Sequence, residues 1–242
     1  ANLERLRWLA DAMGDAEVLI NVAAAEIQVR RNNQLLWRTR TQVGRAERQT
    51  PLLASSIVRL TLNPTWTVPP TILREDKLPA IRDDISYLER HQMSVLDRDG
   101  NLLDPQSIDW ESPGAIRLRQ SAGSHNPLGR VAVRFDNPFA VYLHDTPSQQ
   151  LFSKAPRAFS SGCVRVEAVD TLLAWLLTPD ELSSVQTRIA SGETQQYRLQ
   201  HPAPLLIAYL TVEASKNGAL RYYPDIYARD VRLIKALAPN VH

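Results

Sequence analysis

The chain has 242 residues, which suits one elaborated domain or two small ones, and its 44% hydrophobic content allows a packed core. Its 28 basic and 26 acidic residues give a net charge of only +2, and no basic run is interleaved with aromatic residues, so a nucleic-acid partner is not indicated. No apolar stretch reaches the roughly 18 to 20 residues that span a bilayer, so no transmembrane segment is expected.

The first part of the chain predicts a helix followed by β-strands. It begins without an initiator methionine or a secretory apolar segment, so we expect a mature or excised form. Leucines at helical spacing predict a short helix over residues 2–13. Apolar and alternating runs then predict strands over residues 18–22, 26–30, 35–41 and 57–62. Asn32-Asn33 marks a turn, and Asn63-Pro64 ends the last of these strands.

A charged segment over residues 73–113 interrupts this β pattern. Ile81, Ile85 and Leu88 lie at helical spacing and predict one amphipathic helix over residues 79–91. Asp99-Gly100 predicts a hairpin within residues 93–103. We interpret the segment as an inserted cap, or lid, over a site; an ordinary surface excursion is the alternative.

The second half of the chain predicts further strands and helices. Strands are expected over residues 116–119, 131–135, 140–143 and 204–212, the last of them central. Helices are expected over residues 169–177 and 225–237, and another begins at Thr178-Pro179, where Glu181 completes a capping box. The predicted fold class is mainly β with flanking helices (α+β).

Cys163 is the only cysteine, so an internal disulfide and a cysteine-rich metal site are both excluded. It follows Ser160-Ser161-Gly162 and precedes a predicted helix. Glycine allows close approach of the backbone to a substrate, and amides around such a turn can face a developing oxyanion. A thiolate near an imidazolium and a helix start has a lowered pKa. With His144 at the end of an apolar strand, the pattern favours a nucleophile and its base; a buried core cysteine is the alternative.

The stretch from His144 to Ser160-Ser161-Gly162-Cys163-Val164-Arg165 resembles the signature of the L,D-transpeptidases with a YkuD-type catalytic domain. Further segments resemble the family in the expected order: residues 43–51, 63–69, 126–131, 142–147 and 223–227. The resemblance covers residues 16–230 and is nearest to the large periplasmic members of Gram-negative bacteria, which carry a capping subdomain. Ser161 departs from the histidine that many members have there.

The resemblance implies a YkuD-type β-sandwich catalytic domain over residues 16–72 and 114–242, a linker helix over residues 1–15 and a capping subdomain over residues 73–113. It implies 3→3 cross-linking of peptidoglycan through a cysteine thioester, with D-alanine released from a donor tetrapeptide stem and a second stem as acceptor. Carbapenem β-lactams as covalent inhibitors and a periplasmic location are also implied. Two alternatives stay open: an L,D-carboxypeptidase or hydrolase that trims stems or releases wall-anchored protein, and a non-catalytic peptidoglycan-binding module.

The resemblance also assigns roles to residues. Cys163 is the expected nucleophile and His144 its base, with the amides of Gly162 and Cys163 as the oxyanion hole and the main chain of Asp145 orienting His144. The expected substrate-binding residues are Tyr142, Arg165, Ser161, Ser160 and Trp66. Each has a structural alternative: strand packing for Tyr142, an ion pair with Glu167 for Arg165, the turn itself for the serines and core packing for Trp66.

No metal or cofactor is expected, because the histidines form no cluster at ligand spacing. His125 could approach the site from its loop. The remaining histidines carry no expected role: His91, His201 and His242.

Overall fold

The computed structural model describes residues 1–32, 34–215 and 217–238, so Asn33 of the predicted turn and His242 lie outside the described residues. The main sheet has the strand order β11-β3-β12-β10-β9-β4-β13-β1-β2, and β2 also pairs with β3. The strands from β3 to β2 therefore form a closed ring of paired strands, and β11 pairs with β3 outside this ring. The predicted mainly β class with flanking helices is confirmed, and the expected sandwich is joined along one side by the pairing of β2 with β3.

The bounds of the main-sheet strands are β1 Val18–Asn21, β2 Glu26–Arg31, β3 Gln34–Gly44, β4 Leu53–Leu62, β9 Val131–Phe135, β10 Leu143–His144, β11 Ala158–Ser160, β12 Val164–Val166 and β13 Gln195–Ala208. Successive side chains of a strand point to opposite faces, and one face of each strand fills the core. Ile20, Leu60, Val133 and Leu143 are fully buried in this core cluster.

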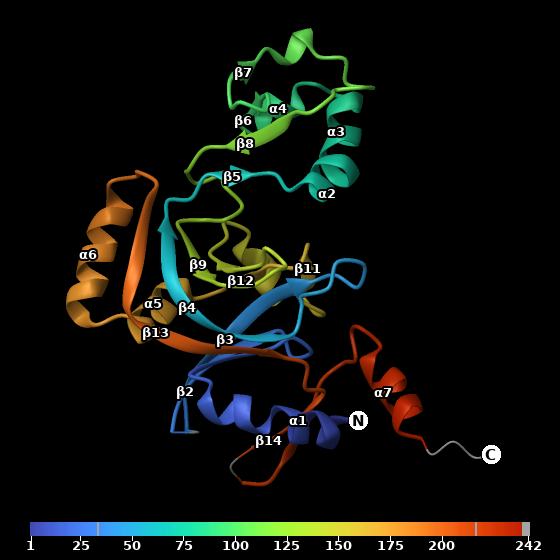
Figure 1. The fold of residues 1–242 in the computed structure, drawn as a ribbon, viewed down its shortest axis with the longest axis vertical. Helices are drawn as coiled ribbons and strands as arrows, with labels where there is room; N and C mark the ends of the chain where they lie inside the picture. The colour runs from blue at the N-terminus through green and yellow to red at the C-terminus, as the bar shows by residue number, and fades with distance from the viewer. Residues whose placement is uncertain (33, 216, 239–242) are drawn as a thin grey trace.

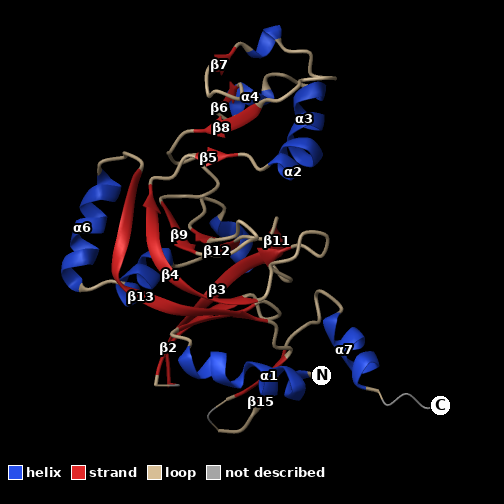
Figure 2. Cartoon of the chain, viewed as in Figure 1, coloured by secondary structure: helices blue, strands red, loops and turns tan. Residues whose placement is uncertain are grey.

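Helices flank the sheet (Figure 2). Their bounds are α1 Asn2–Asp15, α5 Val169–Leu176, α6 Pro179–Ala190 and α7 Arg229–Leu237. The capping box of Thr178 and Glu181 is present at the start of α6, as predicted. The predicted helix over residues 225–237 begins only at Arg229, because the Asp225 carboxylate accepts the backbone N–H groups of Arg229 and Asp230, both at 2.9 Å, and holds a turn there.

A second sheet forms a separate small lobe, residues 66–120, at the top of Figure 1. Its order is β5-β8-β6-β7, and its elements are β5 Trp66–Thr67, α2 Pro70–Ile72, η1 Leu73–Lys77, α3 Leu78–Asp83, α4 Tyr87–Arg90, β6 Met93–Leu96, β7 Leu102–Leu103, η2 Pro105–Ser107 and β8 Arg117–Gln120. The lobe has its own apolar core around Ile81, Leu88 and Leu118. The predicted hairpin is present as β6 and β7.

Two expectations for the small lobe differ from the structure. The single helix over residues 79–91 is wrong: α3 and α4 are separated at Asp84, whose carboxylate accepts the Ser86 amide at 3.0 Å and the Ser86 hydroxyl at 2.7 Å. The strand predicted over residues 116–119 lies in this lobe and not in the main sheet, because β8 pairs with β5 and β6. The lobe therefore extends beyond residues 73–113 on both sides.

Two asparagines fix the junction of the small lobe with the main sheet. Asn63 ends β4 with a left-handed backbone, φ 44°, and its amide donates to the carbonyls of Ile189 at 3.0 Å and Glu193 at 3.2 Å, near the end of α6. Asn126 is buried and donates to the Pro64 carbonyl at 2.9 Å. The two chain segments that enter and leave the lobe are thus held side by side.

The remaining elements are η3 Gln149–Ser153, β14 Val212–Ala214 and β15 Leu220–Tyr222, the last two paired as a hairpin. Within the described ranges, none of the helices combines the length and the apolar character that crossing a membrane requires.

Candidate active site

The chemistry-bearing side chains project from one face of two neighbouring strands. β10 and β12 are parallel, with Leu143 opposite Val164 and His144 opposite Arg165. Leu143 and Val164 point into the core, so the residues flanking them point to the other face. Tyr142, His144, Cys163 and Arg165 therefore gather on that face, with His144 and Cys163 as diagonal neighbours. The fold brings the expected nucleophile and base to one place.

The strand predicted over residues 140–143 is shorter and later than expected. The side chain of Asn137 accepts the amides of Phe139 at 3.1 Å and Val141 at 3.2 Å, and Ala140 has a φ of 54°. This turn delays the start of β10 until Leu143, so His144 lies inside the paired segment. The pairing of β10 with both β9 and β12 gives the backbone of His144 a fixed position.

His144 is buried and oriented by the main chain of the next residue. Its Nδ1 lies 2.5 Å from the carbonyl oxygen of Asp145. A carbonyl only accepts, so Nδ1 carries the proton and Nε2 keeps its lone pair. Burial, followed by the charge of Arg165, lowers the pKa of His144 to about 3. The imidazole is therefore neutral at neutral pH and able to accept a proton.

Cys163 does not have the lowered pKa expected from its sequence context. Burial raises the pKa of its thiol, and this outweighs hydrogen bonding from Tyr142 and the charges of Arg134 and Arg165. The expected helix start is also distant, because α5 begins only at Val169. The resting pair is a neutral thiol and a neutral imidazole.

The turn before Cys163 is held by the buried Ser160. Its hydroxyl accepts the Gly162 amide at 3.1 Å and donates to the Cys163 carbonyl. Gly162 has a φ of 115°, a backbone conformation that favours glycine. The Gly162 amide is thus already used, contrary to its expected place in an oxyanion hole. The Cys163 amide has no partner within the part of the chain that the structure describes.

A hydrogen-bonded chain missed by sequence reasoning supports this turn. The Thr50 hydroxyl donates to the Gly162 carbonyl at 2.9 Å and accepts the Gly44 amide at 2.8 Å, while the Thr50 amide donates to the Tyr227 hydroxyl at 3.2 Å. Gly44 fits only as glycine, because a Cβ there would overlap the carbonyl of Arg48. The segments that carried the family resemblance include Gly44, Thr50 and Tyr227. The spacing of these residues in the sequence did not predict that they are in contact.

Arg165 is not paired with Glu167. Its guanidinium donates to the Gln42 side chain at 3.0 Å, and Glu167 pairs with Arg40 instead. A second arginine, which sequence reasoning did not single out, also faces the site. The Arg134 guanidinium lies 3.8 Å from the centre of the Tyr142 ring, which is a cation–π contact.

Ser161 is exposed and joins the turn to the small lobe. Its hydroxyl accepts a hydrogen bond from Arg48 at 2.9 Å. The same guanidinium pairs with Glu75 at 2.6 Å and Asp76 at 2.7 Å, both in η1. Trp66 lies apart from Cys163: it packs in the apolar core of the small lobe, with the Lys77 ammonium 5.6 Å from its ring.

The other histidines stay outside this group. The His91 ring lies 4.1 Å from that of Tyr87, His125 accepts a hydrogen bond from Gln120 through its carbonyl, and His201 is exposed on β13. In the described segments, no three His, Cys, Asp or Glu side chains are arranged to hold a metal ion.

Residues 15–188 match the family model of the L,D-transpeptidase catalytic domain, YkuD. A Haemophilus influenzae protein named "Putative L,D-transpeptidase" is 36% identical over 236 residues, 95% of this chain and 47% of its own length. The chain thus spans about half the length of that curated relative.

Solved L,D-transpeptidases are more distant. L,D-transpeptidase 3 from Mycobacterium tuberculosis has 10% identity and a TM-score of 0.36, with 79% of this chain and 60% of that chain covered. The L,D-transpeptidase from Mycobacterium smegmatis has 15% identity and a TM-score of 0.32, with 80% and 59% covered.

Proposed function

The chain belongs to the L,D-transpeptidase (YkuD) family, and on this premise we propose that it cross-links peptidoglycan by cysteine acyl transfer. The observation that carries the proposal is the gathering of Tyr142, His144, Cys163 and Arg165 on one face of β10 and β12. The Cys163 thiol and the His144 imidazole belong to this group, and the Cys163 amide has no partner among the described residues. These are a nucleophile, a base and an oxyanion donor.

In the acylation step, the Cys163 sulfur attacks the carbonyl carbon of the third residue of a tetrapeptide stem. The thiol proton passes to Nε2 of His144, and the Cys163 amide donates to the developing oxyanion. The C–N bond to the terminal D-alanine then breaks, and His144 returns the proton to the leaving amine. Since thiol and imidazole both start neutral, the proton moves during the attack.

In the second step, the side-chain amine of a diaminoacyl residue on another stem attacks the thioester. The amide of a 3→3 cross-link forms, and the thiol of Cys163 is restored with the proton from the amine.

Water in place of the amine gives an L,D-carboxypeptidase or a hydrolase that releases wall-anchored protein. A pure binding module is less well supported, because binding requires neither a thiol nor an oriented base. We therefore also propose a periplasmic location, because peptidoglycan lies outside the cytoplasm.

We also propose that the small lobe caps the substrate groove. The support is the Arg48 side chain, which is largely buried and bonds Ser161 of the catalytic turn and the acidic pair of η1 at the same time. A cap joined to the turn in this way would control which acyl donors reach Cys163.

Mass spectrometry of the intact protein tests the nucleophile. The wild type should gain one carbapenem mass, and Cys163→Ala should gain none. Incubation with disaccharide tetrapeptides and analysis of the products then separates the reactions: cross-linked dimers support transpeptidation, tripeptides alone support the carboxypeptidase, and turnover by Cys163→Ala would remove the mechanism.

A further inference from the structure

A row of arginines crosses the sheet and ends at the nucleophile. Arg198 of β13 lies opposite Arg59 of β4, and Arg59 lies opposite Arg134 of β9. The pairing of Val133 with Leu143 and of Ala132 with His144 places Arg134 beside Tyr142, in agreement with their cation–π contact. Tyr142 in turn neighbours Cys163. The three arginines therefore share the face of the sheet from which the catalytic side chains project.

A bulge in β4 creates this row. Ile57 is opposite Phe135, and the next pair is Arg59 with Arg134, so Val58 has no partner of its own. In a regular ladder Val58 would oppose Arg134, and Arg59 would oppose the buried Val133 on the core face. The extra residue turns Arg59 to the opposite face, which is a recurrent use of bulges near functional sites.

The charges of the row are not neutralised by the protein. Within the described residues, Arg59, Arg134 and Arg198 form no ion pair with a carboxylate, and Arg59 and Arg198 are exposed. Arg134 donates to the Thr61 hydroxyl at 3.3 Å and contacts the Tyr142 ring, and neither group carries a charge that would neutralise it. Like charges directly opposite on neighbouring strands are destabilising. An anionic ligand would remove this repulsion, so the row has the charge and the spacing of an anion site.

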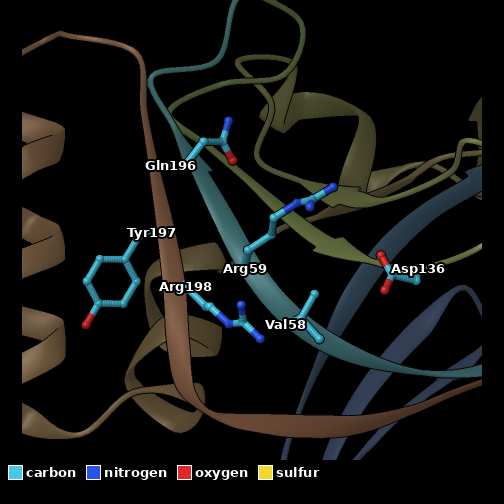
Figure 3. A pocket seen from close by; sticks show the side chains of 6 residues that line it. All are labelled: Val58, Arg59, Asp136, Gln196, Tyr197 and Arg198. Atoms are coloured by element: carbon cyan, nitrogen blue, oxygen red, sulfur yellow. The ribbon is translucent and has the colours of Figure 1, made fainter.

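The row opens on a cavity of about 250 Å³ (Figure 3). Figure 3 shows Arg59, Gln196 and Arg198 projecting to one side of β4 and β13, with Tyr197 on the opposite side. Asp136 lies at the far edge of the cavity, outside ion-pair distance of both arginines. Two guanidiniums, an amide and one carboxylate suit a ligand that has carboxylates together with an amine or amide.

We propose that Arg59 and Arg198 bind carboxylates of a peptidoglycan peptide stem whose reacting carbonyl lies at Cys163, with Arg134 continuing the positive track between them. The proposal rests on the proposed function. Arg59 is three strands from Cys163, roughly 14 Å at the spacing of neighbouring strands. The three stem residues that end at the reacting carbonyl span roughly 10 Å when extended, so the long side chains of the stem and of Arg59 must cover the remaining distance. Arg198 lies one strand farther from Cys163.

The test measures binding separately from turnover. The Kd of a tetrapeptide stem is determined with Cys163→Ala protein, with and without the double change Arg59→Gln and Arg198→Gln. We expect a Kd at least about tenfold higher in the double variant, as a loss of about 1.4 kcal/mol gives. Arg59→Lys, which keeps the charge, should restore part of the affinity. The control is Arg31→Gln, which removes an equal charge from the exposed last position of β2.

A stem with amidated carboxylates should bind equally to both proteins. Equal affinity of the parent and the double variant for the acidic stem would overturn the proposal, as would an absence of stem binding by the Cys163→Ala protein. Melting temperature and the alkylation of Cys163 by iodoacetamide in the wild-type background show whether the variant keeps its fold and site. If the arginines bind the stem but the wild type makes no product, the anion site stands and the proposed function fails.

Discussion

The hydroxyl of Thr50 donates to the carbonyl oxygen of Gly162 at 2.9 Å, and that carbonyl belongs to the same peptide group as the amide of Cys163. A peptide group is planar, with its C=O and N–H pointing in opposite directions. By fixing the carbonyl, Thr50 therefore also fixes the direction of the Cys163 amide, which is the proposed oxyanion donor. Thr50 acts through the backbone and is a positioning residue.

Thr50→Val should lower the rate of carbapenem acylation of Cys163 by about 10- to 100-fold, the scale reported for misplaced catalytic geometry. It should also lower the free energy of unfolding by about 1–3 kcal/mol, because the buried Gly44 amide loses its acceptor. Time-resolved mass spectrometry and urea unfolding measure the two effects. Thr187→Val, in the exposed face of α6, is the matched control. An acylation rate equal to that of the wild type would exclude the positioning role.

Gly129→Ala should disturb the orientation of His144 by displacing Asp145. Gly129 has a φ of 61°, and a Cβ there would overlap the carboxyl group of Asp145, whose carbonyl orients the imidazole. Backbone strain and overpacking should together cost about 2–5 kcal/mol of unfolding free energy. Gly114→Ala separates the two causes, because Gly114 has a φ of 66° with nothing near its Cβ position. Equal losses in the two variants would show that only the backbone conformation matters.

Patterns within single segments were predictable from sequence. The strands around Val18, Glu26 and Val131 and the capping box at Thr178 follow from local alternation and local hydrogen bonding. The roles of Cys163 and His144 stay predictions, and the structure places the two residues on the same face of β10 and β12. The predicted helix bounds were wrong at Asp84 and Asp225. At each position a carboxylate accepts hydrogen bonds from nearby amides and ends or delays the helix.

Relationships between segments were not predictable. The bulge at Val58 decides which face Arg59 occupies, and no alternation rule reveals an unpaired residue. The contact of Thr50 with Gly162 joins residues more than a hundred positions apart. The raised pKa of Cys163 depends on burial beneath neighbouring strands, which outweighs the charges that the local sequence suggested.

Stability should depend on pH through His144. An unfolded histidine binds its proton near pH 6.5, but folded His144 does so only near pH 3, so the folded state binds fewer protons in this window. The contribution of neutral His144 to the free energy of unfolding is therefore complete above pH 6.5 and is lost as the pH falls toward 3. Urea unfolding between pH 7 and 4 gives the free energy of unfolding as a function of pH. The slope of this free energy against pH should be steeper by up to about 1.4 kcal/mol per pH unit in the wild type than in His144→Gln. Identical slopes would contradict a buried neutral imidazole.

The link between Arg48 and Asp76 should hold the small lobe against the catalytic turn. In the wild type, the hydrogen bond from Arg48, followed by the charge of Arg48, lowers the pKa of the Asp76 carboxyl. Asp76→Asn removes the negative charge of this pair. The exposed part of the pair limits its worth to about 1 kcal/mol, so we expect up to about fivefold faster labelling of Cys163 by a bulky maleimide. Labelling by small iodoacetamide should change less, because it needs no opening of the lobe. Asp83→Asn, exposed on α3, gives the effect of charge alone. If bulky and small reagents accelerate equally, the variant has altered the thiol and not the lobe.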